Sequence, residues 1–259
     1  MAPQQRFTFD EIAEGYDRHR PGYPDQLFRD LLATAGVATG GKVLEIGCGT
    51  GQATKSLAAR GLQILCLEAG PNLARIARRE LGGFPNVEVR CSTFEDWRMD
   101  CEPFDLVVSA QAFHWLHEEV RFSKTSEALL PSGSLAVIGN SVVSDHSPGL
   151  AGLQEEYLRH APELVGPPPM NWYTESGPLR SLFDESPYFG PVVVARYPWS
   201  HSYTAADYIG LLGTHSDHRL LPASQREALH SAIFGRIQSA GGRIEIAYQA
   251  NLYVARRAA

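Results

Sequence analysis

The sequence has little of what would place the protein outside the cell or in a membrane. Its 259 residues include four cysteines, and none of them forms a pair with the CxxC spacing of zinc and redox sites. No apolar run reaches the ~18 residues of a membrane span, and residues 1–20 lack the apolar core of a secretion signal. These absences exclude a disulfide framework and a zinc site, and we expect a soluble cytoplasmic protein with reduced thiols.

Positive charge is also scarce. Lys and Arg total 23 against 29 Asp and Glu, which gives a formal net charge of -6. Nucleic-acid binding needs a basic face that neutralises phosphates, so we expect no nucleic-acid partner. His201, His215, Asp217 and His218 are metal-ligand residue types, but their spacing matches no closed metal site, so we predict no metal. The composition leaves the oligomeric state open.

From Lys42 onward the sequence alternates short apolar runs with helical stretches. Such alternation, with short connections, is typical of βαβ units on a parallel sheet. The predicted strands are residues 42–47, 63–68, 86–90, 104–110 and 134–140. The helices predicted between them are residues 51–60, 71–81 and 118–130.

The alternation is interrupted on both sides. Two helices, residues 8–19 and 24–35, are predicted before it, separated by the breaker around Pro21 and Gly22. After Asn140 the regular pattern stops. The later predicted elements are a helix at 149–160 with Ser147 as N-cap, strands at 191–197 and 244–255, a helix capped by Thr204, and a helix from Pro222 to about Gly241.

The strongest functional signal lies where the first predicted strand ends. Gly47, Gly49 and Gly51 stand at alternate positions after the apolar run and lead into a helix. Glycines permit a tight turn and close approach of a ligand, and the helix N-terminus favours an anionic group. Glu68 ends the next predicted strand, where a carboxylate accepts hydrogen bonds from both hydroxyls of a ribose. Together these residues predict a ribose-containing ligand.

With these motifs the chain resembles the class I S-adenosylmethionine-dependent methyltransferases, above all over residues 8–140. The resemblance implies a Rossmann-like, doubly wound α/β fold whose seven-stranded sheet is mostly parallel, with an antiparallel last strand and a helical cap. It also implies one domain, residues 1–259, with an N-terminal lid at 1–40 and a cap insertion at 141–190. The matching segments are residues 45–51 for the glycine motif, 67–78 for the second strand, 104–116 for the fourth strand and its loop, and 129–140 for the fifth strand.

The cofactor that the resemblance implies is S-adenosyl-L-methionine. Glu68 would hold the ribose diol, and Gln111 would also face the cofactor. Thr93 stands where many members carry an acidic residue, so the backbone N–H of Phe94 is the adenine contact that the resemblance leaves. The residues that would surround the methionine and ribose are Glu45, Gly47, Gly49 and Gly51.

The segment from Tyr16 to Pro24 is similar to the N-terminal piece of a subgroup that includes the trans-aconitate methyltransferases. There Tyr16 and Arg20 would close over the cofactor, with Arg20 pairing with its carboxylate. The alternative is an ordinary helix end followed by a proline turn.

The segment after the fourth strand is expected at the carboxyl edge of the sheet, where ligands of such sheets bind. His114 in this segment has three open roles: a general base, a residue that positions the acceptor, or a packed structural residue. Trp115, Trp172 and Tyr173 are candidates to line an apolar acceptor pocket, although aromatic residues of this kind also pack under caps.

The predicted reaction is in-line transfer of a methyl group to a small molecule. A sulfonium already carries a good leaving group, so alignment of the nucleophile is the main task, and no nucleophilic Ser or Cys is required. Two alternatives remain open from the sequence: another reaction of S-adenosylmethionine on the same fold, such as cyclisation of its aminobutyrate chain, or a non-catalytic cofactor-binding protein.

Overall fold

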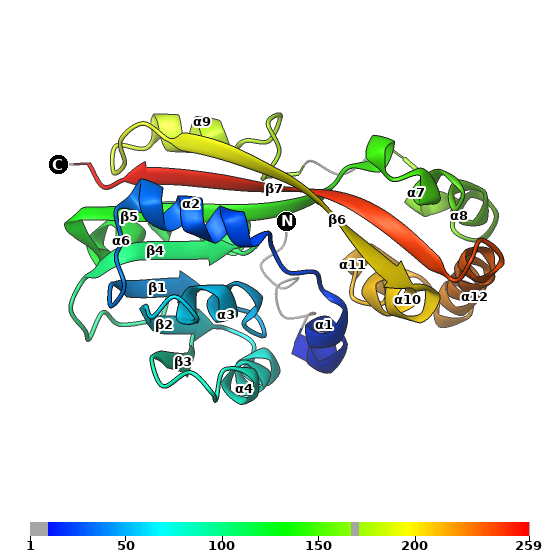
Figure 1. Cartoon of the computed structure of the whole chain (residues 1–259), viewed down its shortest axis with the longest axis horizontal. Helices are drawn as coiled ribbons and strands as arrows, with labels where there is room; N and C mark the ends of the chain where they lie inside the picture. The colour runs from blue at the N-terminus through cyan, green and yellow to red at the C-terminus, as the bar shows by residue number, and fades with distance from the viewer. Residues whose placement is uncertain (1–9, 167–170, 259) are drawn as a thin grey trace.

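The structure of the protein, a computed structural model, describes residues 10–166 and 171–258. Its centre is a sheet of seven strands in the order β3-β2-β1-β4-β5-β7-β6, with helices on both faces (Figure 1). β7 is antiparallel to both neighbours and the other pairs are parallel, which confirms the predicted doubly wound fold. The strands are β1 (Lys42–Ile46), β2 (Gln63–Glu68), β3 (Val87–Cys91), β4 (Phe104–Ala110), β5 (Leu129–Val142), β6 (Val193–Thr204) and β7 (Arg243–Arg256).

The middle strands are buried on both faces, which explains their continuous apolar runs. Successive side chains of β1 alternate between the two faces. Val43 belongs to a core shared with α2 (Asp25–Ala35) and α3 (Gln52–Ala58), whereas Leu44 belongs to a core shared with α9 (Leu179–Glu185). The other helices around this sheet are α4 (Pro71–Glu80), α5 (Glu118–Arg121) and α6 (Ser123–Ala128).

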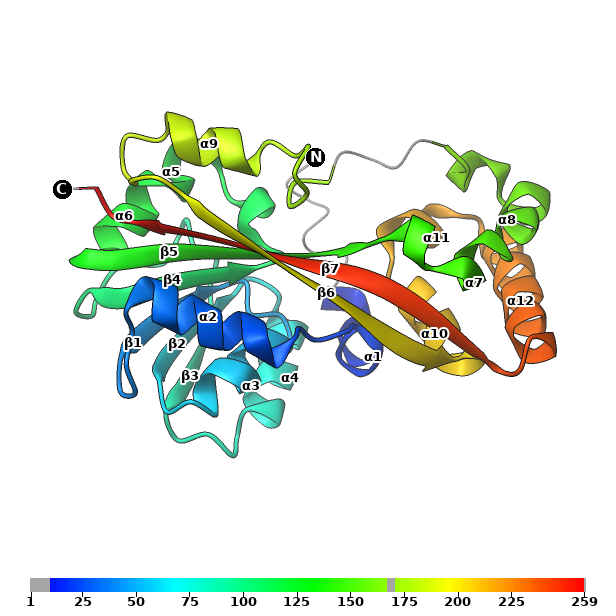
Figure 2. The same ribbon diagram turned by 45° about the horizontal axis from the view of Figure 1, so that its top comes forward.

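A second group of helices, which we call the helical lobe, lies beyond the far end of β6 and β7 (Figures 1 and 2). Its apolar side chains form a separate core around Tyr208, Leu229 and Ile233. The expected cap at 141–190 supplies the first two of its helices, while α9 from the same range packs on the main sheet. The helices of the lobe are α7 (Pro148–Ala151), α8 (Gln154–His160), α10 (Ala205–Leu212), α11 (Ser216–Leu220) and α12 (Ala223–Ser239).

The N-terminal helix α1 (Ala13–His19) lies between the two halves of the molecule (Figures 1 and 2). It contacts α4 on the sheet side and α10 in the helical lobe. The sequence predicted this helix from residue 8, but regular α-helix begins at Ala13 after a short 3-10 turn, and residues 8 and 9 lie outside the described part. Within that part, no helix is both long and apolar enough to cross a membrane.

The expectations for two helix regions need correction. The helix predicted at 118–130 is broken at Phe122 and ends at Ala128, because Pro131 favours an extended residue before it and the chain enters β5. Ser147 precedes α7 as predicted, but its hydroxyl does not cap the helix. It donates instead to the Val143 carbonyl at 2.9 Å and accepts the N–H of Ala247 at 2.8 Å.

The strand predicted at 191–197 extends to Thr204, and this lengthening carries the chain to the helical lobe. The side chains of Trp199 and Tyr203 lie on the face that the lobe covers, where Trp199 stacks on Tyr248 of β7 with ring centroids 5.0 Å apart. The predicted cap at Thr204 is confirmed, since its hydroxyl accepts the N–H of Asp207 at 3.1 Å.

Candidate functional site

A cavity of about 720 Å³ opens at the carboxyl ends of β1, β2, β4 and β5 and extends to α1 and the helical lobe. β1 and β4 are neighbours in the middle of the sheet, where the strand order reverses and ligands of such sheets bind. The predicted site residues that line it are Tyr16, Arg20, Glu45, Gly47, Gly49, Glu68, Thr93, Phe94, Gln111, His114, Trp115, Trp172 and Tyr173. Gly51 is not part of this lining, and a Cβ there would meet Leu81 at 3.1 Å.

The three glycines of the loop after β1 have different structural roles. Gly47, Gly49 and Gly51 have φ angles of 69°, 59° and 98°, in the left-handed region that favours glycine. A Cβ on Gly47 would lie 2.4 Å from the Cβ of Ala112, so this glycine lets the β1 and β4 loops pack together. A Cβ on Gly49 would meet no protein atom nearer than 3.6 Å, so its open side faces the cavity.

Glu68 both faces the cavity and anchors the loop. Its Oε2 accepts the N–H of Gly49 at 2.9 Å, and its Oε1 accepts the N–H of Gly70 at 2.8 Å. Burial raises the pKa of Glu68 to about 7, although these two hydrogen bonds act in the opposite direction. Each carboxylate oxygen can accept a second hydrogen bond, so the group can still receive two ligand hydroxyls.

Glu45 is the second buried carboxyl of the cavity, with 1% of its surface exposed. Burial raises its pKa to about 7, a hydrogen bond from Thr54 acts against this, and the charge of Glu68 adds to the rise. Within the described residues, no Lys or Arg forms an ion pair with either carboxyl. Two buried acids without a cationic partner favour a ligand that brings positive charge.

Replacement of Glu45 by glutamine should stabilise the ligand-free protein at high pH. Because the folded pKa of about 7 is above the usual glutamate pKa of 4.5, the native carboxyl contributes stability below pH 4.5 and loses it as the pH rises through 7. The unfolding free energy of Glu45→Gln relative to the native chain should therefore rise by about 2–3 kcal/mol between pH 5 and pH 8. Urea titrations at both pH values measure this, and a pH-independent difference would contradict it.

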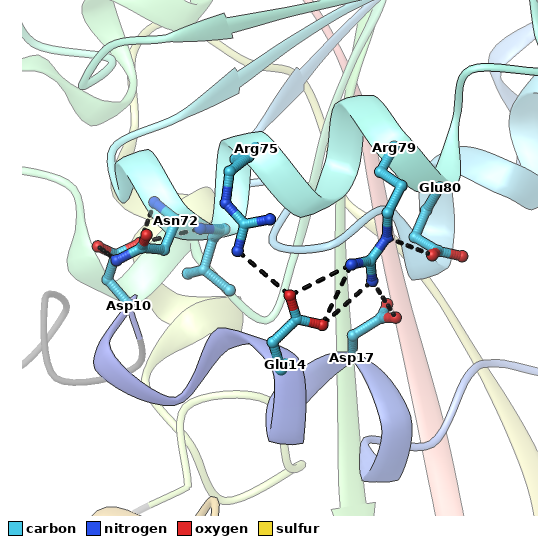
Figure 3. A network of polar contacts seen from close by, with 8 residues as sticks. Asp10, Glu14, Asp17, Asn72, Arg75, Arg79 and Glu80 are labelled. Atoms are coloured by element: carbon cyan, nitrogen blue, oxygen red, sulfur yellow. Dashed lines mark hydrogen bonds and ion pairs between the residues drawn. The ribbon is translucent and has the colours of Figure 1, made fainter.

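Polar contacts tie α1 to α4 (Figure 3). Asp10 accepts the backbone N–H groups of Asn72 and Leu73 at 2.7 and 2.9 Å, at the start of α4. One turn further along, Glu14 pairs with Arg75 and Arg79, with N–O distances of 3.2 Å. The acidic face of α1 thus meets the basic face of α4.

On its other side, α1 contacts the helical lobe. Arg20 donates from Nε to the Thr214 hydroxyl at 2.9 Å and from Nη2 to the Thr214 carbonyl at 3.0 Å. Glu11 pairs with Arg219 at 2.7 Å. Arg20 lines the cavity, and it also joins α1 to the segment between α10 and α11, which the sequence did not indicate.

The loop after β4 holds a strained residue and the predicted histidine. Gln111 has a φ of 58°, and it is the one non-glycine residue with positive φ in the described part of the chain. Such a backbone persists only where its surroundings hold it, and it is common at functional sites. Its side-chain amide donates to the Asn140 carbonyl at 3.3 Å across the ends of β4 and β5.

His114 lies between aromatic rings at the same edge. Its centroid is 4.4 Å from that of Trp115 and 6.1 Å from that of Trp172, and its Nδ1 is 2.5 Å from the Tyr173 hydroxyl. Burial, and then the positive charge of Arg121, lower the pKa of His114 to about 4. The imidazole is therefore neutral and weakly basic at neutral pH, which is unfavourable for a general base.

Sequence reasoning missed several polar groups of the cavity. Asn140 ends the strand predicted at 134–140 in the same way that Glu68 ends the strand predicted at 63–68, so its place at a predicted strand end was a usable signal, although β5 itself continues to Val142. The others come from outside the first five strands, and no local pattern marks them: Asn171, Tyr208, His215 and Tyr248.

Comparisons with known proteins agree with this geometry. The family model described as a methyltransferase domain matches residues 43–133. A relative from Geobacillus kaustophilus, named as an uncharacterized methyltransferase, is 30% identical over 187 residues, which cover 68% of this chain and 85% of the relative. A methyltransferase-like protein of Schizosaccharomyces pombe is 25% identical over 87% of this chain and 84% of its own length.

Solved structures show the same fold. One from Anaeromyxobacter dehalogenans, whose name ascribes it to the type II methyltransferases, has a TM-score of 0.67 and 23% identity over 92% of this chain and 97% of that one. Phosphoethanolamine N-methyltransferase 2 of Haemonchus contortus, in complex with phosphomonomethylethanolamine and S-adenosylhomocysteine, has a TM-score of 0.56 and 16% identity over 96% of this chain and 58% of that one. The protein is a methyltransferase, and it belongs to the class I S-adenosylmethionine-dependent family.

Proposed function

We propose that the protein transfers the methyl group of S-adenosylmethionine to a small molecule by in-line displacement. The observation that carries this is the pair of buried carboxyls, Glu45 and Glu68, beside the open side of Gly49 in one cavity. S-adenosylmethionine supplies a ribose diol for Glu68 and a sulfonium charge that the acidic end of the cavity favours. The volume of about 720 Å³ lies in the range of small-molecule sites.

We keep the cofactor contacts implied by the resemblance with one change. The Thr93 hydroxyl already donates to Asp96 at 2.7 Å and accepts its N–H at 3.0 Å, so Thr93 contributes no adenine contact in this proposal. Among the described residues, the N–H of Phe94 has no hydrogen-bond partner, and Phe94 lines the cavity. It therefore remains our candidate for the adenine contact.

When bound, S-adenosylmethionine supplies an electrophilic methyl group on a good leaving group. The chain has to hold an acceptor in line with it and keep water away, and such orientation contributes on the order of 7–11 kcal/mol in favourable cases. Trp115, Trp172 and Tyr173 form the aromatic wall that serves as the acceptor side in this proposal. The acidic charge of the cavity gives no support for a polycarboxylate acceptor, so we do not extend the trans-aconitate resemblance to the substrate.

Product analysis tests this function. The pure protein is incubated with S-adenosylmethionine and the low-molecular-mass fraction of a cell extract, and the nucleoside products are separated. Formation of S-adenosylhomocysteine with a methylated small molecule supports the proposal. Methylthioadenosine would instead indicate attack on the aminobutyrate chain, and the absence of both products would indicate a cofactor-binding protein.

We further propose that residues 1–40 act as a lid and residues 141–190 as part of the cap, with residues 1–9 and 167–170 outside the described part. A variant lacking residues 1–20 should bind S-adenosylhomocysteine at least about 10-fold more weakly, because it loses Tyr16 and Arg20 from the cavity wall. Calorimetry measures the affinity. Glu11→Ala, which removes one outer contact of α1, should bind nearly normally.

Hydrogen exchange in α1 should slow on ligand addition, and equal exchange would refute the lid.

A further inference from the structure

Tyr173 is held on the sheet with little freedom. A Cβ on Gly139 of β5 would lie 2.0 Å from the Cβ of Tyr173, so this glycine makes the room in which Tyr173 sits. The Tyr173 N–H donates to the Asn171 side chain at 3.0 Å, and the Tyr173 carbonyl accepts the Tyr253 hydroxyl at 3.2 Å. With 3% of its surface exposed, Tyr173 has a fixed place from which to act on His114.

The hydrogen bonds of the Tyr173 hydroxyl can be counted. A phenol has one O–H to donate and two lone pairs to accept with. Among the described residues, the His114 Nδ1 is the only group within hydrogen-bond distance that can accept the hydroxyl proton. The hydroxyl proton is thus left for the His114 Nδ1, which lies 2.5 Å away. Since burial raises the pKa of Tyr173 far above its usual value, the phenol keeps this proton at any neutral pH.

This count decides the tautomer of His114. A neutral imidazole that accepts at Nδ1 carries its proton on Nε2. Within the described residues, Nε2 has no hydrogen-bond partner, and His114 lines the cavity. The ring therefore turns an N–H donor toward the ligand space, while its lone pair is occupied by Tyr173.

The surroundings also keep the ring neutral. Arg121 is 6% exposed, its guanidinium lies 5.0 Å from the centroid of the Trp172 ring, and its Nε and Nη1 have no hydrogen-bond partner among the described residues. This positive charge, buried near His114, opposes a second proton on the imidazole. Trp172 lies against both Arg121 and His114, so it keeps the three side chains in one group.

We propose that Tyr173 is a positioning residue that fixes His114 as an Nε2–H hydrogen-bond donor to the methyl acceptor, and that His114 is not the general base. This rests on the proposed function for its role in catalysis. The acceptor then presents an oxygen or nitrogen lone pair to His114, and its nucleophilic atom needs no deprotonation by this residue. Of the three roles open from the sequence, the hydrogen-bond count favours the positioning role.

Nuclear magnetic resonance of the full chain with ¹⁵N-labelled histidine tests the tautomer directly. His114→Gln identifies the His114 signals by their loss among the 9 histidines. At pH 7 the native protein should show a protonated Nε2 and an unprotonated Nδ1 at His114. Tyr173→Phe should move the ring to a mixture of tautomers or to Nδ1–H, because the phenol donor is gone while the aromatic ring still fills the space beside Gly139.

Tyr203→Phe is the matched control, since Tyr203 is a buried tyrosine whose hydroxyl bonds Tyr248 at 2.9 Å in the helical lobe. It should leave the His114 signals unchanged. A native His114 protonated at Nδ1, or signals that Tyr173→Phe does not alter, would overturn the proposal. Calorimetry with S-adenosylhomocysteine on the same samples is independent of this result, so failure of the proposed function is seen separately as failure to bind.

Once a methyl acceptor has been identified, the turnover of two variants distinguishes a hydrogen-bond donor at His114 from a general base. The side-chain amide nitrogen of glutamine can replace the His114 Nε2–H, whereas that of asparagine falls at the Nδ1 position. His114→Gln should retain at least about 10-fold more turnover than His114→Asn if His114 donates a hydrogen bond, a loss of about 1.4 kcal/mol for asparagine. Equal loss of turnover in both variants, with the acid limb absent from the pH profile of the residual turnover, would assign His114 as the base.

Discussion

Replacement of Gly49 by valine should abolish binding of S-adenosylhomocysteine, with a loss of more than about 2.7 kcal/mol, or 100-fold in affinity. The reason is geometric. A Cβ at Gly49 would meet Tyr16 at 3.6 Å and Gln52 at 3.8 Å, so the valine side chain enters the cavity rather than the protein core. Calorimetry measures the affinity, and the thermal transition reports whether the variant is folded.

Gly40→Val is the control for backbone strain. Gly40 has a φ of 86°, and a Cβ there would meet nothing within 4 Å, so the substitution carries a left-handed penalty of roughly 1–2 kcal/mol without touching the site. It should lower stability about as much as Gly49→Val and leave the affinity unchanged. Gly47→Ala should lower stability more than either valine substitution, because its Cβ would overlap Ala112. A folded Gly49→Val protein with normal affinity would refute the assignment of the loop.

Glu68→Ala should weaken S-adenosylhomocysteine binding by about 1–3 kcal/mol, the scale of hydrogen bonds that buried hydroxyls donate to a charged group. The structure adds a second cause, because the N–H groups of Gly49 and Gly70 lose their acceptor and the loop loses its anchor. The unfolding free energy of the ligand-free protein should change less than the binding free energy, since the variant also loses a carboxyl whose burial is unfavourable at neutral pH.

Two control variants sharpen this test. Glu68→Gln keeps an oxygen acceptor and nearly the same shape. Its affinity for S-adenosylhomocysteine should therefore lie between that of Glu68→Ala and that of the native chain. Glu88→Ala on the neighbouring strand β3 removes an exposed carboxylate paired with Arg90 and should bind normally. If Glu68→Ala has native affinity, another residue must hold the ribose.

The parts of the fold that depend on nearby residues were predicted well. Strands β1 to β4 start and end within about one residue of the prediction. The buried strands β1, β2 and β4 give largely apolar runs between turn residues, and the edge strand β3 gives an alternation of valine and charged residues. The reach of β6 was missed. From Pro198 to Thr204 its side chains include Ser200, His201 and Ser202, which are polar and exposed, and only pairing with β7 makes this segment a strand.

The site residues were also predicted where the signal is local and missed where it depends on distant parts of the chain. Gly47, Gly49 and Glu68 sit in a strand-turn-helix pattern that can be read from adjacent residues. The contact of Arg20 with Thr214 spans 194 positions and that of His114 with Tyr173 spans 59, and neither partner carries a local signal. Long-range pairing of this kind is decided by the assembled core, so the sequence predicted which residues reach the cavity better than which residues touch one another.

The long ribbon of β6 and β7 positions the helical lobe, which forms one wall of the cavity. β5 ends at Val142, opposite Tyr248, and the five residue pairs from Ser200 with Ala247 to Thr204 with Arg243 join β6 and β7 alone. A two-stranded ribbon twists more strongly than a wide sheet, and its hydrogen-bonded length is set by its residue pairs. The length of the ribbon therefore sets how far the helical lobe lies from the sheet, and its twist sets the orientation of the lobe. Through these ten residues, and with α1 in contact with both α4 and α10, the ribbon determines how the lobe's wall of the cavity faces the glycine loop.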